Sequence, residues 1–97
     1  MTIGAETDRV YLDTPARCAI QDRGWRRRVV IEKSSAASTV VWNPWAEKGA
    51  ALADLGDPAW RGMVCVETGI IADNEVRLIA GGEHEMSTMI CAADAEP

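Results

Sequence analysis

One carboxylate, Glu67, stands out as a candidate catalytic group because it comes near the end of an apolar, β-forming run at residues 63–69. Side chains alternate between the two faces of a strand, so Glu67 shares a face with Met63 and Cys65. Burying an ionised carboxylate there is costly unless its pKa rises, and a raised pKa suits a general base. The run therefore predicts Glu67 as a general base. The alternative is a carboxylate that lies where the strand emerges into water.

The single histidine, His84, is a weaker candidate for an acid–base partner. It lies between Glu83 and Glu85, directly after the turn-forming pair Gly81-Gly82. A glycine turn followed by charged residues is typical of solvent-exposed chain. We therefore expect His84 to be a solvated residue at the start of a strand.

The cysteines do not form a metal-binding pattern. Cys18, Cys65 and Cys91 are far apart in sequence, and the chain has no Cys-x-x-Cys pair. Structural zinc sites usually take ligands paired at such a short spacing. Each cysteine lies in an apolar, strand-like stretch, so we expect three reduced core residues and no metal site.

Four arginines within residues 23–28 suggest an anion-binding patch. Alternation puts Arg27 on the opposite face of the chain from Arg26 and Arg28. We therefore expect these arginines to be the solvated end of a hairpin rather than a site for phosphate or nucleic acid.

Length and composition fit one small folded domain, because the 97 residues are 47% hydrophobic and 26% charged. A net charge of −5 disfavours nucleic acid or an anionic membrane as the main partner. The sequence has no run of about 20 apolar residues, and its first residues lack a signal-peptide pattern. We expect no membrane partner and a cytoplasmic location.

Apolar runs separated by turn signals predict a mainly β, mostly antiparallel fold with one short helix. The expected strands are residues 9–12, 18–21, 25–33, 39–42, 63–69, 75–79 and 85–92, the second and third forming a hairpin. Asn43 and Pro44 are suited to start a helix, which we expect over residues 45–55. Trp25 and Trp60 are expected to be packing anchors.

Two of the expected strands are apolar on both faces, at residues 29–31 and 64–66. A continuous apolar run is typical of a strand that is covered on both sides. A chain of 97 residues cannot easily cover its own sheet twice. We therefore expect uncovered sheet faces that favour self-association or another partner.

Three segments together resemble the hexose-6-phosphate mutarotases, also called glucose-6-phosphate 1-epimerases, of the galactose-mutarotase-like superfamily. They are Glu6-Thr7-Asp8-Arg9-Val10-Tyr11, Thr39-Val40-Val41-Trp42-Asn43-Pro44-Trp45 and Met63-Val64-Cys65-Val66-Glu67-Thr68. Their order and spacing, with the loop at residues 53–57, resemble the carboxyl-terminal portion of that family. The resemblance spans nearly the whole chain but only about the last third of a family member.

The resemblance implies that residues 1–97 form one unit, the carboxyl-terminal part of an antiparallel β-supersandwich. Its cleft would bind a hexose 6-phosphate and interconvert the α and β anomers. By resemblance, Glu67 is the catalytic carboxylate, Asp8 is a sugar-binding acid, and Trp42 and Asn43 are substrate-binding residues beside the cleft. The family's catalytic histidine and phosphate-binding arginines belong to a part that this sequence does not contain.

Anomer exchange needs one base and one acid. The base removes the proton of the anomeric hydroxyl while the acid protonates the ring oxygen, and the two exchange roles on closure. Glu67 suits the base, Asp8 suits hydrogen bonds to sugar hydroxyls, and Trp42 or Trp45 offers a flat apolar face. We expect no cofactor. Without the family's acid, the chain alone is expected to have little activity.

A function of a different class is a small β module that binds a carbohydrate or a partner protein without chemistry. The strands that are apolar on both faces motivate this alternative, because uncovered faces favour partners. A mutarotase for unphosphorylated sugars is a third possibility. The phosphate-binding residues that would decide between the sugars are not in the sequence.

Overall fold

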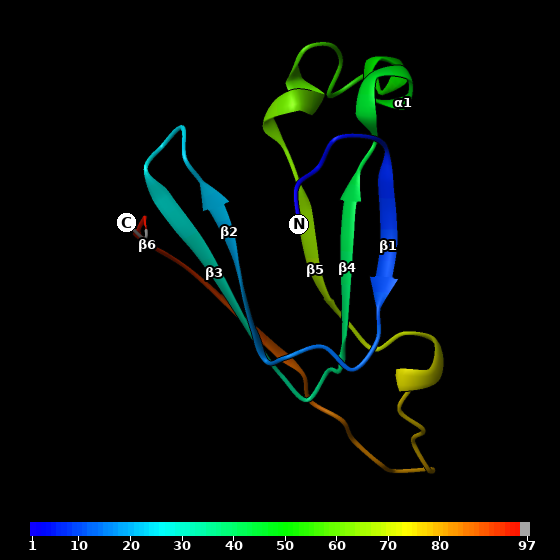
Figure 1. Cartoon of the computed structure of the whole chain (residues 1–97). Helices are drawn as coiled ribbons and strands as arrows, with labels where there is room; N and C mark the ends of the chain where they lie inside the picture. The colour runs from blue at the N-terminus through cyan, green and yellow to red at the C-terminus, as the bar shows by residue number, and fades with distance from the viewer. Residues whose placement is uncertain (96–97) are drawn as a thin grey trace.

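The computed structural model describes residues 1–95, which fold mainly into β-strands (Figure 1). Within these residues the strands are β1 (Thr7–Tyr11), β2 (Arg17–Asp22), β3 (Arg27–Ser34), β4 (Ser38–Asn43), β5 (Cys65–Gly69) and β6 (Ser87–Asp94). The α-helix α1 spans Trp45–Ala51, and two 3₁₀ helices span Ala59–Gly62 (η1) and Ala72–Asn74 (η2). The predicted fold class, mainly antiparallel β with one short helix, is confirmed.

The strands of the described residues form two antiparallel sheets, ordered β1-β4-β5 and β2-β3-β6. The sheets lie close together at one end of the molecule and diverge toward the other, which gives a V shape (Figure 1). The loops from β1 to β2 and from β3 to β4 cross between the sheets at the closed end. The V is therefore open at the end that carries α1.

The β2–β3 hairpin is formed as predicted, with a turn over residues 23–26. Asp22 holds its end by an ion pair to Arg27, with 3.0 Å between Oδ2 and Nε. The prediction that Trp25 is a packing anchor is wrong, because this side chain is 77% exposed at the turn. Its ring contacts the guanidinium of Arg27 at 5.6 Å rather than a core.

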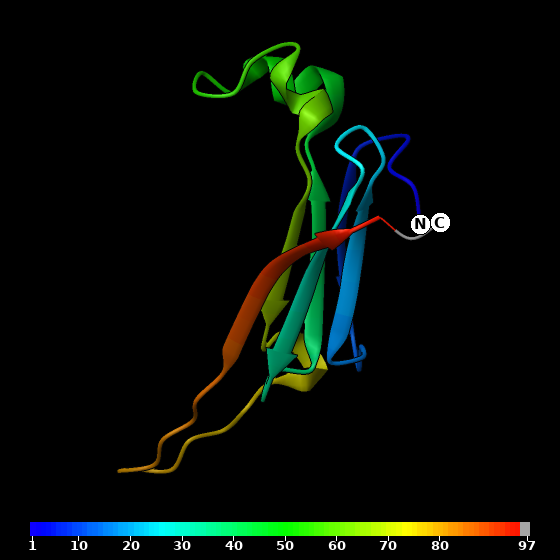
Figure 2. The ribbon, with the colours of Figure 1, turned by 90° about the vertical axis from the view of Figure 1, so that its left-hand side faces the viewer.

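The segment that follows η2 differs from its prediction. Residues 75–79 form no strand and, together with residues 80–86, run away from both sheets (Figure 2). Leu78 and Ile79 are 59% and 83% exposed. A β-prone run needs a partner strand to complete its hydrogen bonds, and no described strand lies beside this one.

The helix begins at Trp45 as predicted but ends at Ala51 instead of residue 55. Gly56, with a φ of +74°, lies in the turn that follows, in a conformation that glycine adopts without strain. No helix among residues 1–95 is long and apolar enough to cross a membrane.

The buried apolar core is small. Among the described residues it consists of Val30, Ile31, Val41 and Trp60. The three cysteines are free thiols, but the prediction that all are core residues is wrong, because Cys18 and Cys91 are exposed and Cys65 is half-buried. Cys18 lies on β2 and Cys91 on β6, and the strand register places the two thiols on opposite faces of their sheet.

Candidate active site

The three segments that carry the sequence motifs meet in the β1-β4-β5 sheet, with β4 in the middle. Asp8 pairs with Trp42, and Trp42 pairs with Cys65. Directly paired residues of antiparallel strands project from the same face, so these three side chains form one row across the sheet. The next row on that face consists of Val10, Val40 and Glu67. We call this face, which points away from the β2-β3-β6 sheet, the outer face.

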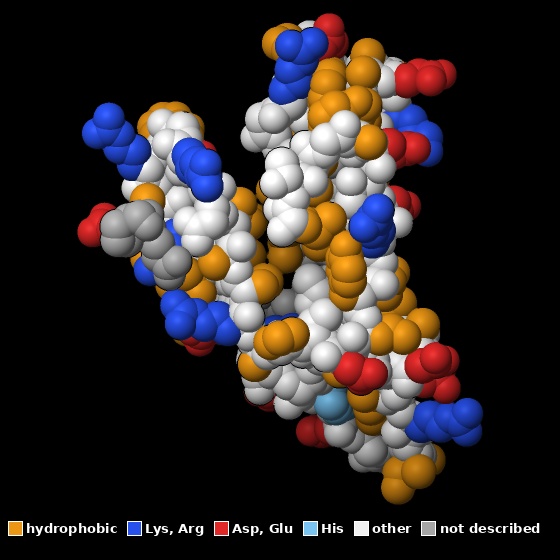
Figure 3. Space-filling model, viewed as in Figure 1, with side chains coloured by type: hydrophobic (Ala, Val, Ile, Leu, Met, Phe, Trp, Pro, Cys, Tyr) orange, Lys and Arg blue, Asp and Glu red, His pale blue; other side chains and the backbone are white. Residues whose placement is uncertain are grey.

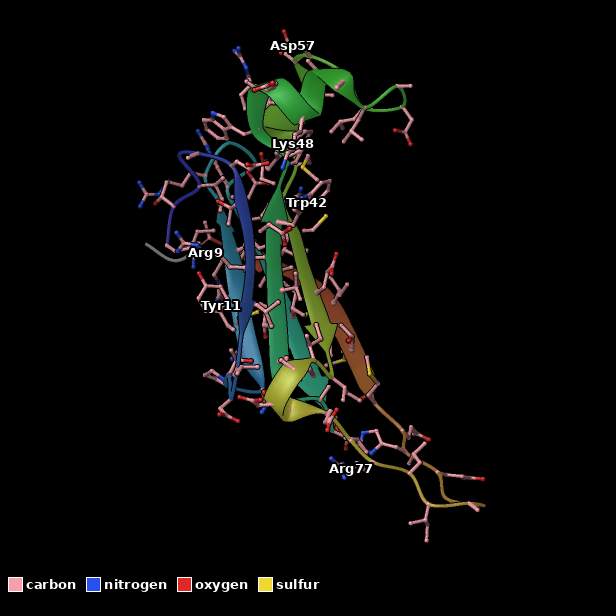
Figure 4. All side chains as sticks on the ribbon, turned by 90° about the vertical axis from the view of Figure 1, so that its right-hand side faces the viewer. Arg9, Tyr11, Trp42, Lys48, Asp57 and Arg77 are labelled. Carbon is pink, nitrogen blue, oxygen red and sulfur yellow. The ribbon has the colours of Figure 1, made fainter. Side chains whose placement is uncertain are left out.

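Asp8, Trp42 and Glu67 therefore lie on the outer face together. Asp8 and Glu67 are separated by two strand spacings and two residues along the strand, about 12 Å for strands about 4.8 Å apart with a rise of about 3.4 Å per residue. Trp42 lies on the middle strand (Figure 4) and pairs with Asp8. The face thus presents two carboxylates with an indole ring on the strand between them.

Glu67 is exposed in this structure. The expectation of a carboxylate enclosed by apolar groups is not met within residues 1–95, because no described element covers the outer face and its neighbours Val40 and Cys65 are themselves half-buried. Burial raises the pKa of the Cys65 thiol, and the negative charge of Glu67 raises it further. The carboxylate of Glu67 thus acts electrostatically on the face that it shares with Cys65.

Asn43 lies on the opposite face from Trp42, and its carboxamide is engaged by the protein. Its Nδ2 donates to the carbonyl oxygens of Trp60 at 3.0 Å and Met63 at 2.7 Å, and its Oδ1 accepts from the backbone N–H of Trp45 at 2.8 Å. Asn43 is 3% exposed. The structure therefore places it as an internal support for the bend that follows Trp42.

That bend leads into the cap, which we define as residues 45–62 with α1 and η1. Trp45 has a φ of +62°, a conformation that costs a bulky residue on the order of 1–3 kcal/mol. The indole rings of Trp45 and Trp60 are 4.9 Å apart, and Nε1 of Trp60 donates to Asp57 at 2.9 Å. These contacts and the Asn43 hydrogen bonds hold the strained bend at the end of the outer face.

Lys48 links the cap to the start of β1. Its Nζ lies 2.5 Å from Oε1 of Glu6, and the carboxylates of Glu6, Asp8 and Glu47 raise its pKa, with the Glu6 hydrogen bond as the largest cause. Figure 4 shows Lys48 next to the Trp42 end of the sheet. Lys48 was not among the residues predicted from the sequence. The signal that could have found it is a cation three residues after one motif and a carboxylate at the start of another.

His84 is remote from this face. It is exposed, and its Nε2 lies 2.6 Å from the carbonyl oxygen of Ser35, in the loop at the closed end of the V. Among residues 1–95, no cluster of three His, Cys, Asp or Glu side chains is placed to hold a metal ion.

The inner face of the same sheet borders a groove between the two sheets. The groove has a volume of about 820 Å³ and is lined on one side by Val41, Val64 and Val66 and on the other by residues of β2 such as Ile20. Hydrophobic side chains line the hollow between the arms of the V (Figure 3). None of the three outer-face residues Asp8, Trp42 and Glu67 lines the groove.

Comparison with known proteins supports the relation that the motifs suggested. The family model described as aldose 1-epimerase matches residues 1–91, which is nearly the whole chain.

The chain belongs to the aldose 1-epimerase family.

Several curated relatives carry the name "Putative glucose-6-phosphate 1-epimerase". The family member from Cenchrus ciliaris is 41% identical over 63 residues, which is 65% of this chain and 19% of the relative. The Escherichia coli (strain K12) member is 28% identical over 74 residues, 76% of this chain and 25% of the relative. The Salmonella typhimurium member is 33% identical over 67 residues, 69% of this chain and 23% of the relative.

This aldose 1-epimerase family chain thus spans a fifth to a quarter of the length of these relatives. No solved structure matches it at a significant level. Within the family fold, the outer face offers a carboxylate that can exchange a proton, a second carboxylate that can bind hydroxyl groups, and an aromatic surface. These are the groups that sugar recognition and proton transfer use.

Proposed function

We propose that the outer face supplies the base and the sugar-binding groups for interconversion of the α and β anomers of a hexose 6-phosphate. The observation that carries the proposal is the alignment of Asp8, Trp42 and Glu67 on one face by strand pairing, in a chain of the aldose 1-epimerase family. The names of the curated relatives support glucose 6-phosphate as the substrate.

In the proposed reaction Glu67 accepts the proton of the C1 hydroxyl. The C1–O5 bond breaks as an acid protonates O5, and the aldehyde rotates before the ring closes on its other face with the proton transfers reversed. Glu67 is exposed, and no hydrogen bond or ion pair engages its carboxylate within the described residues, so the carboxylate is free to exchange a proton. Asp8 accepts hydrogen bonds from sugar hydroxyls, and the Trp42 ring packs against the apolar face of the pyranose.

Within the described residues, no candidate for the general acid of this reaction has been placed opposite Glu67. The single histidine of the chain, His84, lies at the closed end of the V and does not face Glu67. General acid catalysis is worth about 10² to 10⁴ in rate. We therefore expect the chain by itself to accelerate anomer exchange weakly.

Two measurements test the proposal. Titration with glucose 6-phosphate, followed by backbone amide NMR, should shift resonances at Asp8, Trp42 and Glu67. Polarimetry of freshly dissolved α-glucose 6-phosphate should show a rate slightly above that of buffer, and Glu67→Gln should return it to the buffer rate.

Glu85→Gln is the matched control, because Glu85 is an exposed carboxylate far along the chain from the motifs. It should change neither the titration nor the rate. A wild-type rate equal to buffer, together with no shift on the outer face, would contradict the proposal. Shifts on the outer face without any catalysis would indicate a carbohydrate-binding module instead.

A further inference from the structure

The chain exposes more surface than a self-contained domain of its size. Folded monomers of 10.5 kDa expose about 5,400 Å², whereas this chain exposes 7217 Å². Its Cα radius of gyration is 15.7 Å, compared with about 12.5 Å for a compact domain of the same length. The excess of about 1,800 Å² is larger than the roughly 800 Å² that one partner buries in an interface of standard size.

The groove between the sheets accounts for part of this excess. Its walls carry apolar side chains that are only partly covered, including Ile20, Val64 and Val66, and the exposed thiol of Cys18. Such residues normally fill the interior between two packed sheets, which lie about 10 Å apart. Here the sheets diverge toward the end that carries α1 (Figure 1), and a hollow separates the side chains of the two arms there (Figure 3).

The charge of the groove is also distinctive. Two arginines, Arg17 and Arg23, line it, and no Asp or Glu does, although the chain has 15 acidic residues and a net charge of −5. Arg17 also forms an ion pair with Glu32, with 3.6 Å between Nε and Oε1. An occupant should therefore be apolar along the groove and neutral or acidic where it meets Arg23.

We propose that the groove is a docking site for a polypeptide equivalent to the part of the aldose 1-epimerase relatives that this chain does not cover. That part makes up three quarters or more of each curated relative. It is large enough to bury the excess surface, and extended segments with alternating apolar side chains would fill the space between the two sheets.

A second copy of the chain fits the groove less well. In a two-fold dimer the same surface meets itself, and two concave surfaces leave each other unfilled. Such a dimer would also bring Arg17 and Arg23 of one copy toward those of the other, and of these only Arg17 has an ion pair of its own within residues 1–95, to Glu32. The proposal concerns binding and does not depend on the proposed catalytic role of Glu67.

The experiment uses the full chain and, as a separate polypeptide, the Escherichia coli relative from which the segment matched to this chain has been removed. Sedimentation of the mixture should show a one-to-one complex. Alkylation of Cys18, which lines the groove, should slow at least about tenfold in the complex. Cys91, which does not line the groove, reports alkylation outside it.

Matched variants locate the contact. Val66→Arg puts a charge into the groove and should weaken the complex at least about tenfold. Val76→Arg makes the same change outside the groove and should leave it unchanged. Ile20→Arg makes the same change on the opposite wall of the groove. Circular dichroism of each variant alone verifies folding, and if Val66→Arg misfolds, Ile20→Arg takes its place in the test.

The outcomes separate the occupants. The proposal is overturned if the chain stays monomeric in the mixture and no complex forms. It is also overturned if Val66→Arg and Val76→Arg weaken the complex equally. Self-association of the chain with Cys18 protected identifies a second copy as the occupant and also overturns it. Complex formation without mutarotation leaves the docking site in place and contradicts only the proposed function.

Discussion

The cap and the groove are both built around apolar side chains, yet one is closed and the other is open. In the cap, Trp60 is 5% exposed, and its ring, its indole N–H and its carbonyl oxygen all have partners within residues 43–57. In the groove, Val66 and Ile20 are only half-buried and face each other across an open space. The difference shows that residues close in sequence complete the packing of the cap, whereas the packing between the distant strands of the two sheets is left open within residues 1–95.

The largest effect expected from this comparison is that of Trp60→Ala. Removing a buried tryptophan typically costs about 3–5 kcal/mol, and here it also removes the contact with Trp45 and the hydrogen bond to Asp57. Urea denaturation measures the loss. Val66→Ala in the open groove should cost about 1 kcal/mol or less, because its side chain is already partly in water. Equal losses of unfolding free energy in the two variants would contradict the difference between the cap and the groove.

Asn43→Asp should have the next largest effect. The substitution keeps the shape of the side chain but removes the donor to the carbonyl oxygens of Trp60 and Met63, which are left facing a carboxylate. Leaving buried groups unsatisfied costs about 1–3 kcal/mol. Thermal unfolding at neutral pH measures the loss. A melting temperature equal to that of the wild type would show that these hydrogen bonds do not hold the bend.

Gly49→Ala tests how tightly the cap is packed. Alanine normally stabilises a helix relative to glycine by about 1 kcal/mol. At Gly49, however, an added Cβ would lie 2.6 Å from Cβ of Trp60, so we expect a net loss of about 1–2 kcal/mol by overpacking. Gly62→Ala, where an added Cβ meets nothing within 4 Å, is the control and should be neutral or stabilising. A stabilised Gly49→Ala variant would mean that the cap is loose.

The smallest expected effect is on thiol reactivity, compared between Cys65 on the outer face and Cys18 in the groove. Burial and the Glu67 charge raise the pKa of Cys65, so iodoacetamide at pH 8 should react more slowly with Cys65 than with the exposed Cys18 of the groove wall. Glu67→Gln should accelerate the reaction of Cys65 without changing that of Cys18. An alkylation rate of Cys65 that is unchanged by this substitution would contradict the electrostatic effect of Glu67 on Cys65.

The raised pKa of Cys65 also predicts a direction for stability against pH. The folded state favours the protonated thiol, so this contribution is fully present below the pKa of the unfolded state. It is lost as the pH rises through the thiol range, above about pH 9. The ion pair of Lys48 with Glu6 has the same sign, because the raised pKa of Lys48 favours its charged form until the pH passes the lysine range.

Local patterns predicted the strands, the β2–β3 hairpin and the start of α1 because each depends on residues that are neighbours in sequence. The family resemblance, in turn, gave the three segments that meet on the β1-β4-β5 sheet. The exposed segment at residues 75–79 and the exposed Trp25 were predicted wrongly, since the sequence shows that a residue is apolar but not whether another element reaches it.

The sequence and the family resemblance named the residues of the candidate site, but not the surroundings of those residues. Alternation placed Glu67 on one face with Cys65, but the exposure of that face depends on elements that the sequence of the strand does not describe. Asn43, like Trp42, was predicted beside the substrate by the family resemblance alone. In a strand, adjacent residues point to opposite faces, and the structure uses its carboxamide inside the protein.

The pairing of β1, β4 and β5 has a consequence for how such a chain can change in evolution. Asp8, Trp42 and Glu67 share a face because their positions in the paired strands have the same parity. Insertion of one residue within β4, between Val40 and Trp42, would turn half of that strand over and separate the indole from Glu67. Insertions in the exposed loop at residues 52–54, between α1 and η1, would preserve both the parity and the packing of Trp60, so length variation should accumulate there.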